Sequence, residues 1–177
     1  GEIARFNDAI NKVKLDLEEL VEKTRETAGK KDLEIIETHL MMIEDPDLKN
    51  QVTQGIAEEG KNAEHIVEIT ISMMTKTLED ADDEYLKERV VDLIDIQSRI
   101  LHHLLYLERT SLVDIEEEVI LVAQTLLPSE VLTMNKKYIK GIVLDTGGKT
   151  SHTAILARSF EIPAVLGLST VTKKVRN

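Results

Sequence analysis

The sequence contains no cysteine and no tryptophan, and aromatic residues make up only 3% of its 177 residues. Without cysteine the chain cannot form disulfides or thiolate metal sites, and this composition fits a reducing cytoplasm. No segment reaches the roughly 18 uninterrupted apolar residues of a membrane span, so we expect no membrane partner. The hydrophobic fraction of 42% is ordinary for a folded protein. The core must therefore consist of aliphatic side chains and methionine.

The N-terminus has neither an initiator methionine nor the apolar stretch of a secretory signal. We therefore expect the sequence to be a piece of a longer, cytoplasmic protein.

The net charge of −11 is distributed unevenly. Residues 1–116 carry 28 acidic and 14 basic side chains, a net charge of −14, whereas residues 117–177 carry 5 acidic and 8 basic ones, a net charge of +3. The acidic part would repel nucleic acid phosphates, which argues against a nucleic acid partner. It could attract a basic protein instead. The alternative is that these acidic residues only keep the helices well solvated.

Apolar residues recur at steps of three and four through residues 2–110, which predicts consecutive helices. Gly29, Pro46 and Gly60 interrupt this pattern, and two long helices are expected over 61–80 and 83–110. The pattern is typical of an antiparallel helical bundle, which we assign to residues 1–115.

Short, β-branched apolar runs replace the helical pattern over residues 116–177. The expected strands cover 118–123, 139–144 and 162–166, with helices starting at Pro128 and covering 150–160. Alternation of strands and helices predicts an α/β subdomain with parallel strands. Because three strands are few for an independent sheet, we expect this subdomain to be incomplete and to borrow strands from outside the sequence. The predicted fold class is therefore a helical bundle attached to a partial α/β subdomain.

The second expected strand is followed by Gly147 and Gly148, which permit a tight turn and close approach of a ligand to the backbone. Thr150 or Ser151 can cap the next helix. His152 then falls in the first turn, where free N–H groups and the helix dipole disfavour an imidazolium and favour an anion. This environment suits both a neutral, nucleophilic histidine and its phosphorylated product. The alternative is an ordinary Gly-Gly turn followed by a solvent-facing histidine, and the spacing does not match a nucleotide-binding P-loop.

The string GGKTSHTAILARSFEIPAVLG, residues 147–167, strongly resembles the phosphohistidine signature of the phosphoenolpyruvate-utilising enzymes. The resemblance implies that His152 is the phosphorylated residue. It also implies phosphoenolpyruvate as the phosphoryl donor, bound with Mg²⁺ on a separate C-terminal barrel domain that this sequence does not contain. The supporting residues that it implies are Gly147, Gly148, Thr150, Ser151 and Arg158.

Three further segments resemble the enzyme I branch of this family, which serves the sugar phosphotransferase system: HLMMIEDPDL at 39–48, DDEYLKERVVDLIDI at 82–96 and EEVILVAQTLLPSE at 117–130. In enzyme I a helical subdomain binds the phosphocarrier protein HPr. The resemblance thus implies phosphoryl transfer from His152 to HPr, the first step of sugar uptake. The implied docking candidates on the helices are His39, Met41, Met42, Asp45, Asp47, Leu48, Leu78, Leu86 and Arg89, with His39 lying either in the interface or elsewhere at the surface.

Other functions stay open at this point. Within the same family, the alternatives are a nitrogen-regulatory or dihydroxyacetone-kinase type of phosphotransferase, or a dikinase or synthase. A different class would be a helical binding module in which His152 is silent.

The remaining histidines offer no metal site. His102 and His103 are adjacent, so they point to different helix faces and cannot form the i, i+4 pair of a helical metal site. We expect them to be structural or solvated, and His65 to lie at the surface. Mg²⁺ is therefore expected only for the full-length enzyme.

Overall fold

A computed structural model describes residues 1–24, 30–106, 112–148 and 151–175. The chain divides into two compact units, Gly1–Arg109 and Thr110–Asn177, which we call the helical unit and the α/β unit. Within the described residues, no helix combines the length and the apolarity that crossing a membrane requires.

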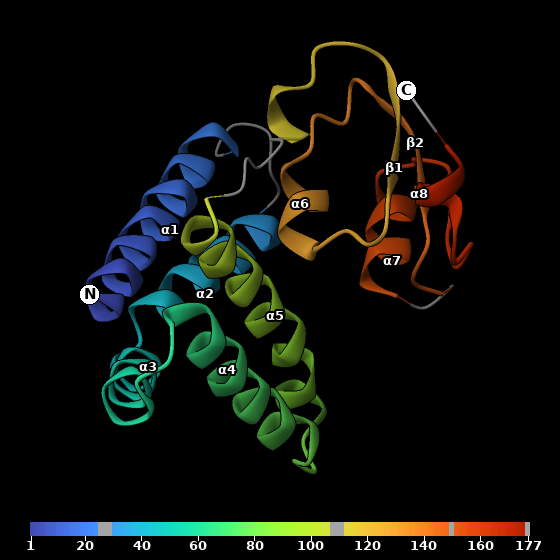
Figure 1. The fold of residues 1–177 in the computed structure, drawn as a ribbon. Coiled ribbons are helices and arrows are strands. Elements are labelled where there is room, and N and C mark those ends of the chain that lie inside the picture. Colours follow the sequence, from blue (N-terminus) through green and yellow to red (C-terminus); the bar gives the residue numbers. More distant parts are fainter. Residues whose placement is uncertain (25–29, 107–111, 149–150, 176–177) are drawn as a thin grey trace. The chain divides into compact units, whose positions relative to one another are not determined.

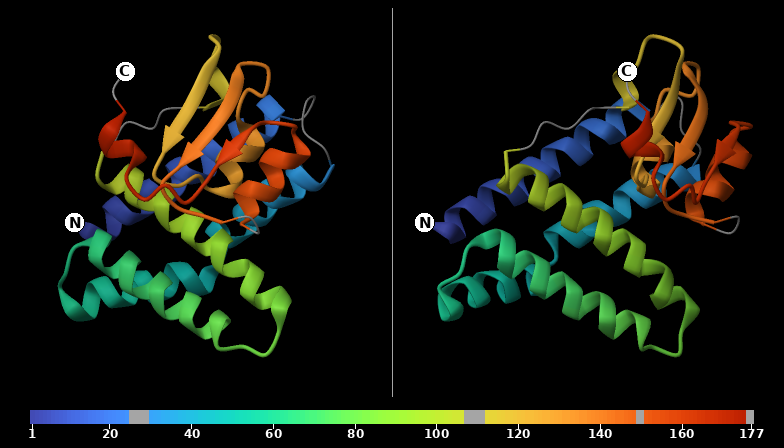
Figure 2. Two further views of the ribbon diagram at one scale, coloured as in Figure 1. Left: turned by 90° about the vertical axis from the view of Figure 1, so that its right-hand side faces the viewer. Right: turned by 45° about the vertical axis from the view of Figure 1, so that its right-hand side comes forward.

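The described residues of the helical unit form five α-helices (Figures 1 and 2). They are α1 (Glu2–Thr24), α2 (Lys30–Glu44), α3 (Pro46–Glu59), α4 (Ala63–Glu79) and α5 (Glu84–Leu104). Each helix buries one apolar stripe in a common core, as the three- and four-residue spacing predicts, and this core includes the aromatic Phe6 besides aliphatic residues. In α1 this stripe is Phe6, Ile10, Val13 and Leu17.

Proline, glycine and polar caps set the helix boundaries in this unit. The Asp45 side chain accepts a hydrogen bond from the Asp47 N–H at 2.8 Å, directly before Pro46 at the first position of α3. Gly60 ends α3 in the left-handed conformation, with a φ of 61°. Asp83 caps α5 by accepting a hydrogen bond from the Tyr85 N–H at 2.8 Å.

The α/β unit contains a parallel sheet in the order β1-β2-β3. Its strands are β1 (Val119–Ala123), β2 (Ile139–Leu144) and β3 (Ala164–Val165), and its helices are the 3₁₀ helix Leu112–Asp114, α6 (Pro128–Thr133), α7 (His152–Ser159) and α8 (Val171–Lys174). Strands and helices alternate along the chain, so parallel neighbours are connected through helices. The core lies between the sheet and helices α6 and α7, and it includes Val131, Ile139, Ile142, Leu144 and Ala157.

The predicted fold class is confirmed: a helical bundle precedes a small parallel α/β unit. Strand 139–144 has the predicted bounds, whereas the 3₁₀ helix Leu112–Asp114 was not predicted and several other elements differ from the prediction. Helix α5 ends at Leu104 instead of residue 110, β3 has only two residues, and α8 was not predicted. Predicted helix residues 107–110 and the predicted helix end at Gly29 lie outside the described part of the chain.

Candidate phosphohistidine site

The loop between β2 and α7, together with helix α7 itself, carries the predicted site residues. The Ser151 hydroxyl oxygen accepts a hydrogen bond from the Ala154 N–H at 3.2 Å, so Ser151 is the N-cap of α7. His152 is the first residue of α7, the position where backbone N–H groups have no helical partner. Thr150, Lys149 and the His152 side chain lie outside the described part of the structure.

The two glycines of the loop have different structural roles. Gly147 has a φ of 92°, and a Cβ built on it would lie 3.4 Å from the Ser151 hydroxyl oxygen. A side chain there would therefore strain the backbone, although its Cβ would only be in ordinary van der Waals contact with this oxygen. Gly148 has no positive φ, and a Cβ on it would meet no atom within 4 Å. Only Gly147 is required by the local conformation.

Helix α7 is anchored by its inward face. Thr153 is buried, and its hydroxyl donates a hydrogen bond to the Leu126 carbonyl oxygen at 3.1 Å. Ala154 and Ala157 are also buried. Small side chains at these positions let the helix lie close to the sheet. Because Thr153 follows His152 directly, its hydrogen bond fixes the turn of the helix that bears the histidine.

Arg158 lies in the last turn of α7 and is exposed. It borders an open pocket with Gly148, Ala154 and Glu161. Glu161 has a φ of 57°, and the hydrogen bond from the Ile162 N–H to the Ala157 carbonyl oxygen, 2.9 Å long, closes the helix end around it. Because Arg158 is exposed and borders this pocket, its guanidinium is accessible to an anionic ligand.

Among the described residues of the loop, Asp145, directly after β2, has the side chain with the most hydrogen bonds. It is buried, and its carboxylate accepts hydrogen bonds from the Val171 N–H, the Thr172 N–H and the Thr172 hydroxyl. The Thr172 hydroxyl, with the two N–H donors, lowers the pKa of Asp145 despite the opposing effect of desolvation. Asp145 and Thr153 were not among the predicted site residues, because each forms its hydrogen bonds with a residue distant in the chain.

The docking candidates on the helices differ in exposure. Met41 is 69% exposed at the end of α2, and Asp45 and Asp47 are exposed at the start of α3. Partly buried candidates are Met42, Leu78, Leu86 and Arg89. These side chains can contribute to a protein contact, whereas two other candidates are buried.

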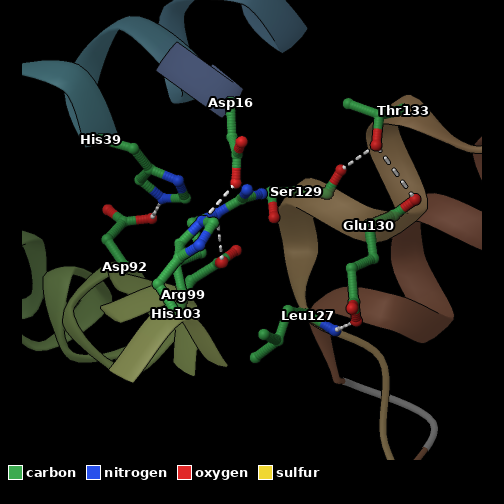
Figure 3. Close-up of polar contacts among 10 residues, drawn as sticks. Asp16, His39, Asp92, Arg99, His103, Leu127, Ser129, Glu130 and Thr133 are labelled. Carbon is green, nitrogen blue, oxygen red and sulfur yellow. Dashed lines mark hydrogen bonds and ion pairs between the residues drawn. The ribbon is translucent and has the colours of Figure 1, made fainter. Parts of the chain in front are cut away.

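His39 is one of these buried residues, so the prediction of an interface or surface position is wrong. Its side chain is fully buried, and its Nε2 lies 3.1 Å from Asp92 Oδ1 (Figure 3). Arg89 donates to the other carboxylate oxygen of Asp92 at 3.1 Å. Burial would raise the pKa of Asp92, but the hydrogen bonds from His39 and Arg89 outweigh it and hold that pKa below its usual value. His39 therefore joins α2 to α5 inside the protein.

Leu48 is the second candidate that the structure removes from the surface. It is 1% exposed and packs in the core with Val52 and Ile56, which follow it at four-residue steps on α3. A side chain in this apolar stripe contributes to folding and is not available to a partner.

The other histidines lie on α4 and α5. Nε2 of His103 lies 2.7 Å from Oδ2 of Asp16, which connects α5 to α1 (Figure 3). His65 and His102 are half-buried. Among the described residues, no three His, Cys, Asp or Glu side chains are grouped so that they could hold a metal ion.

Two family models match the chain. Residues 1–89 match the N-terminal region of the phosphoenolpyruvate-utilising enzymes, and residues 115–177 match their mobile domain. The chain belongs to the phosphoenolpyruvate-utilising enzyme family. The resemblance inferred from residues 147–167 is thereby confirmed.

Among individual proteins, the chain is similar in sequence and structure to enzyme I proteins. It is 42% identical over its full length to the phosphoenolpyruvate-protein phosphotransferase of Priestia megaterium and 40% identical to that of Bacillus subtilis. In both comparisons the chain spans 31% of the relative's length. A solution structure of an enzyme I protein has a TM-score of 0.86 and 44% identity, and the match covers 99% of this chain and 71% of that one. A structure described as "N-terminal domain of Enzyme 1 - Nitrogen" has a TM-score of 0.67 and 25% identity, with coverage of 94% and 67%.

Proposed function

We propose that His152 carries a phosphoryl group between phosphoenolpyruvate and the phosphocarrier protein HPr, as the central residue of an enzyme I. The position of His152 as first residue of α7, behind the Ser151 cap and the Gly147 turn, carries this proposal. Backbone N–H groups at this position favour an attached anion. The 44% identity to an enzyme I structure, against 25% for the nitrogen-type relative, supports the sugar phosphotransferase branch.

The proposed chemistry consists of two in-line transfers at phosphorus. A neutral imidazole nitrogen of His152 attacks phosphorus, the N–P bond forms, and the O–P bond of phosphoenolpyruvate breaks to release the pyruvate enolate, which takes a proton on carbon. A histidine nitrogen of HPr then attacks the same phosphorus, while the N–P bond to His152 breaks. Both steps depend on positioning and charge stabilisation more than on covalent assistance from the protein.

For the docking surface on the helical unit we propose the exposed and partly buried candidates. Met41, Asp45 and Asp47 supply an adaptable apolar contact and two carboxylates at the junction of α2 and α3. Arg89 supplies a cation on α5, held by Asp92. The net charge of −14 over residues 1–116 would attract a basic carrier from a distance. His39 and Leu48 support this surface from inside.

We assign phosphoenolpyruvate and Mg²⁺ to a part of the parent enzyme beyond this chain. The described residues offer no group of metal ligands, and Arg158 is the exposed cation on α7. The proposed setting is the cytoplasm, where transfer to HPr begins sugar uptake.

The test is to incubate the chain with phosphorylated HPr and to measure its intact mass and the modified residue. We expect a gain of about 80 Da, lost on mild acid treatment, located on His152. His152→Ala should abolish the gain and leave the helical content unchanged, while His65→Ala should accept the group as the wild type does. Phosphate on any other histidine would contradict the assignment.

A further inference from the structure

Asp145 caps a helix that lies 26 residues further along the chain. The N-cap residue of α8, Thr170, makes no capping hydrogen bond with its own side chain. The Asp145 carboxylate takes this role, because it accepts from the Val171 N–H, from the Thr172 N–H at 3.3 Å and from the Thr172 hydroxyl. Its two oxygens thus satisfy the first free N–H groups of α8.

The backbone around Asp145 is bonded on both sides. The Asp145 N–H donates to the Ala123 carbonyl oxygen at the end of β1, at 3.2 Å. Thr146 donates twice to the Gln124 carbonyl oxygen, from its N–H at 3.0 Å and from its hydroxyl at 2.9 Å. The start of the loop is therefore fixed to the segment that follows β1.

On its other side the loop is bonded to residues 167–174, which we call the strap. The Ser169 N–H donates to the Asp145 carbonyl oxygen at 2.9 Å, and the Gly167 N–H donates to the Thr146 carbonyl oxygen at 3.2 Å. The Asp145 carboxylate also accepts three hydrogen bonds from the strap, so the main chain and the side chain of Asp145 both connect the loop to the strap.

We propose that Asp145 is a positioning residue for phosphoryl transfer at His152, acting through the strap. This inference rests on the proposed function of His152. Asp145 fixes the start of the loop through its bonds to the strap. At the other end of the loop, the Ser151 N–H donates a hydrogen bond to the Gly148 carbonyl oxygen at 3.0 Å. In transfers that depend on alignment, a misplacement of about 1 Å can lower the rate roughly 100-fold.

The hydrogen bonds from the strap require a carboxylate at position 145, and another polar side chain would not satisfy all of them. Three donors point at two oxygens, and both oxygens are acceptors only when the group is ionised. In Asp145→Asn, one oxygen is replaced by an amide NH₂ that faces a donor, so at least one hydrogen bond is lost and the strap must shift. The partner change Thr172→Val removes the hydroxyl donor alone, and Thr172→Ser restores it.

The test measures a single round of transfer from phosphorylated HPr to His152 in the parent protein at full length. Asp145→Asn should lower the rate constant about tenfold or more, and Thr172→Val several-fold, while the phosphorylated fraction at the end point stays at the wild-type value. Thr172→Ser should transfer close to the wild-type rate. The dependence of rate on HPr concentration should keep its half-saturation value, since docking lies on the helical unit. Asp83→Asn, which alters the cap of α5, is the matched control and should leave the rate unchanged.

The results that would overturn the role of Asp145 differ from those that would overturn the assignment of His152. A wild-type rate constant in both Asp145→Asn and Thr172→Val would overturn the positioning role while leaving His152 as the carrier. A lower end point with an unchanged rate constant would assign Asp145 to folding alone and would also overturn it. Phosphate on a residue other than His152 in the wild type would overturn the proposed function itself, and this inference with it.

Discussion

A methyl group on Gly167 would lie 3.1 Å from the carbonyl oxygen of Gly147. Gly167 has a φ of 81° and Gly147 a φ of 92°, so both residues adopt the left-handed conformation that glycine tolerates best. The strap and the loop before α7 therefore approach each other through two glycines. These glycines are 20 residues apart in the sequence, and His152 lies between them.

We expect Gly167→Ala to destabilise the α/β unit by about 2 kcal/mol or more, because left-handed strain is combined with crowding of the Gly147 carbonyl. Urea unfolding measures this change. Gly60→Ala is the matched control, since Gly60 has a φ of 61° but nothing within 4 Å of a built Cβ. Gly60→Ala should lower the free energy of unfolding only by the backbone strain, about 1 kcal/mol. Equal losses in the two variants would contradict the close approach.

The carboxylate of Asp92 gives the helical unit a pH dependence. Its pKa is held below the usual value, so it stabilises the fold fully above its unfolded pKa of about 3.9, and this contribution is lost as pH falls through the lower folded pKa. Asp92→Asn should lower the free energy of unfolding by about 2 kcal/mol near neutral pH. The difference from the wild type should shrink between about pH 4 and pH 2.

Asp16→Asn provides the comparison for Asp92→Asn, because Asp16 also pairs with a histidine, His103, but is more exposed. Its effect should stay below about 1 kcal/mol, as for most surface ion pairs. Denaturant unfolding at several pH values measures both variants. A difference between Asp92→Asn and the wild type that does not change down to pH 2 would show that this carboxylate is not the group responsible.

Association with HPr should slow as salt concentration rises, because the attraction between an acidic surface and a basic carrier is screened. Asp47→Lys should lower the association rate several-fold at low salt and change dissociation less. Asp45 is a poorer site for charge reversal, since its side chain also caps α3. Asp8→Lys makes the same charge change on α1 and should have a smaller effect. An association rate that is independent of salt would exclude electrostatic steering.

The sequence predicted the local features of the site but not those that depend on distant contacts. The β2 strand, the turn at Gly147 and the cap at Ser151 follow from residue types that act within a few positions. Apolar periodicity also defined the buried helix faces, yet it could not show that Asp92 on α5 would meet His39. Asp145 looked like a loop residue because its partners, 26 and 27 residues away, form a helix too short to leave a periodic pattern.

This chain alone should accept phosphate from phosphorylated HPr but not from phosphoenolpyruvate, even with Mg²⁺. A carboxylated phosphate ester requires several cations and a metal held by carboxylates. On α7 the described exposed cation is Arg158, and the described residues contain no metal-binding group.

Incubation with phosphoenolpyruvate and Mg²⁺, followed by intact-mass measurement, should therefore show no gain of about 80 Da. The parent enzyme at full length is the positive control for the donor, and phosphorylated HPr is the positive control for the chain. If phosphorylated HPr also leaves the chain unmodified while the parent enzyme reacts, the α/β unit requires the strands that we expect from outside this sequence. Stoichiometric phosphorylation of His152 by phosphoenolpyruvate alone would show that the chain contains its own donor site, and would contradict the assignment of that site to a separate domain.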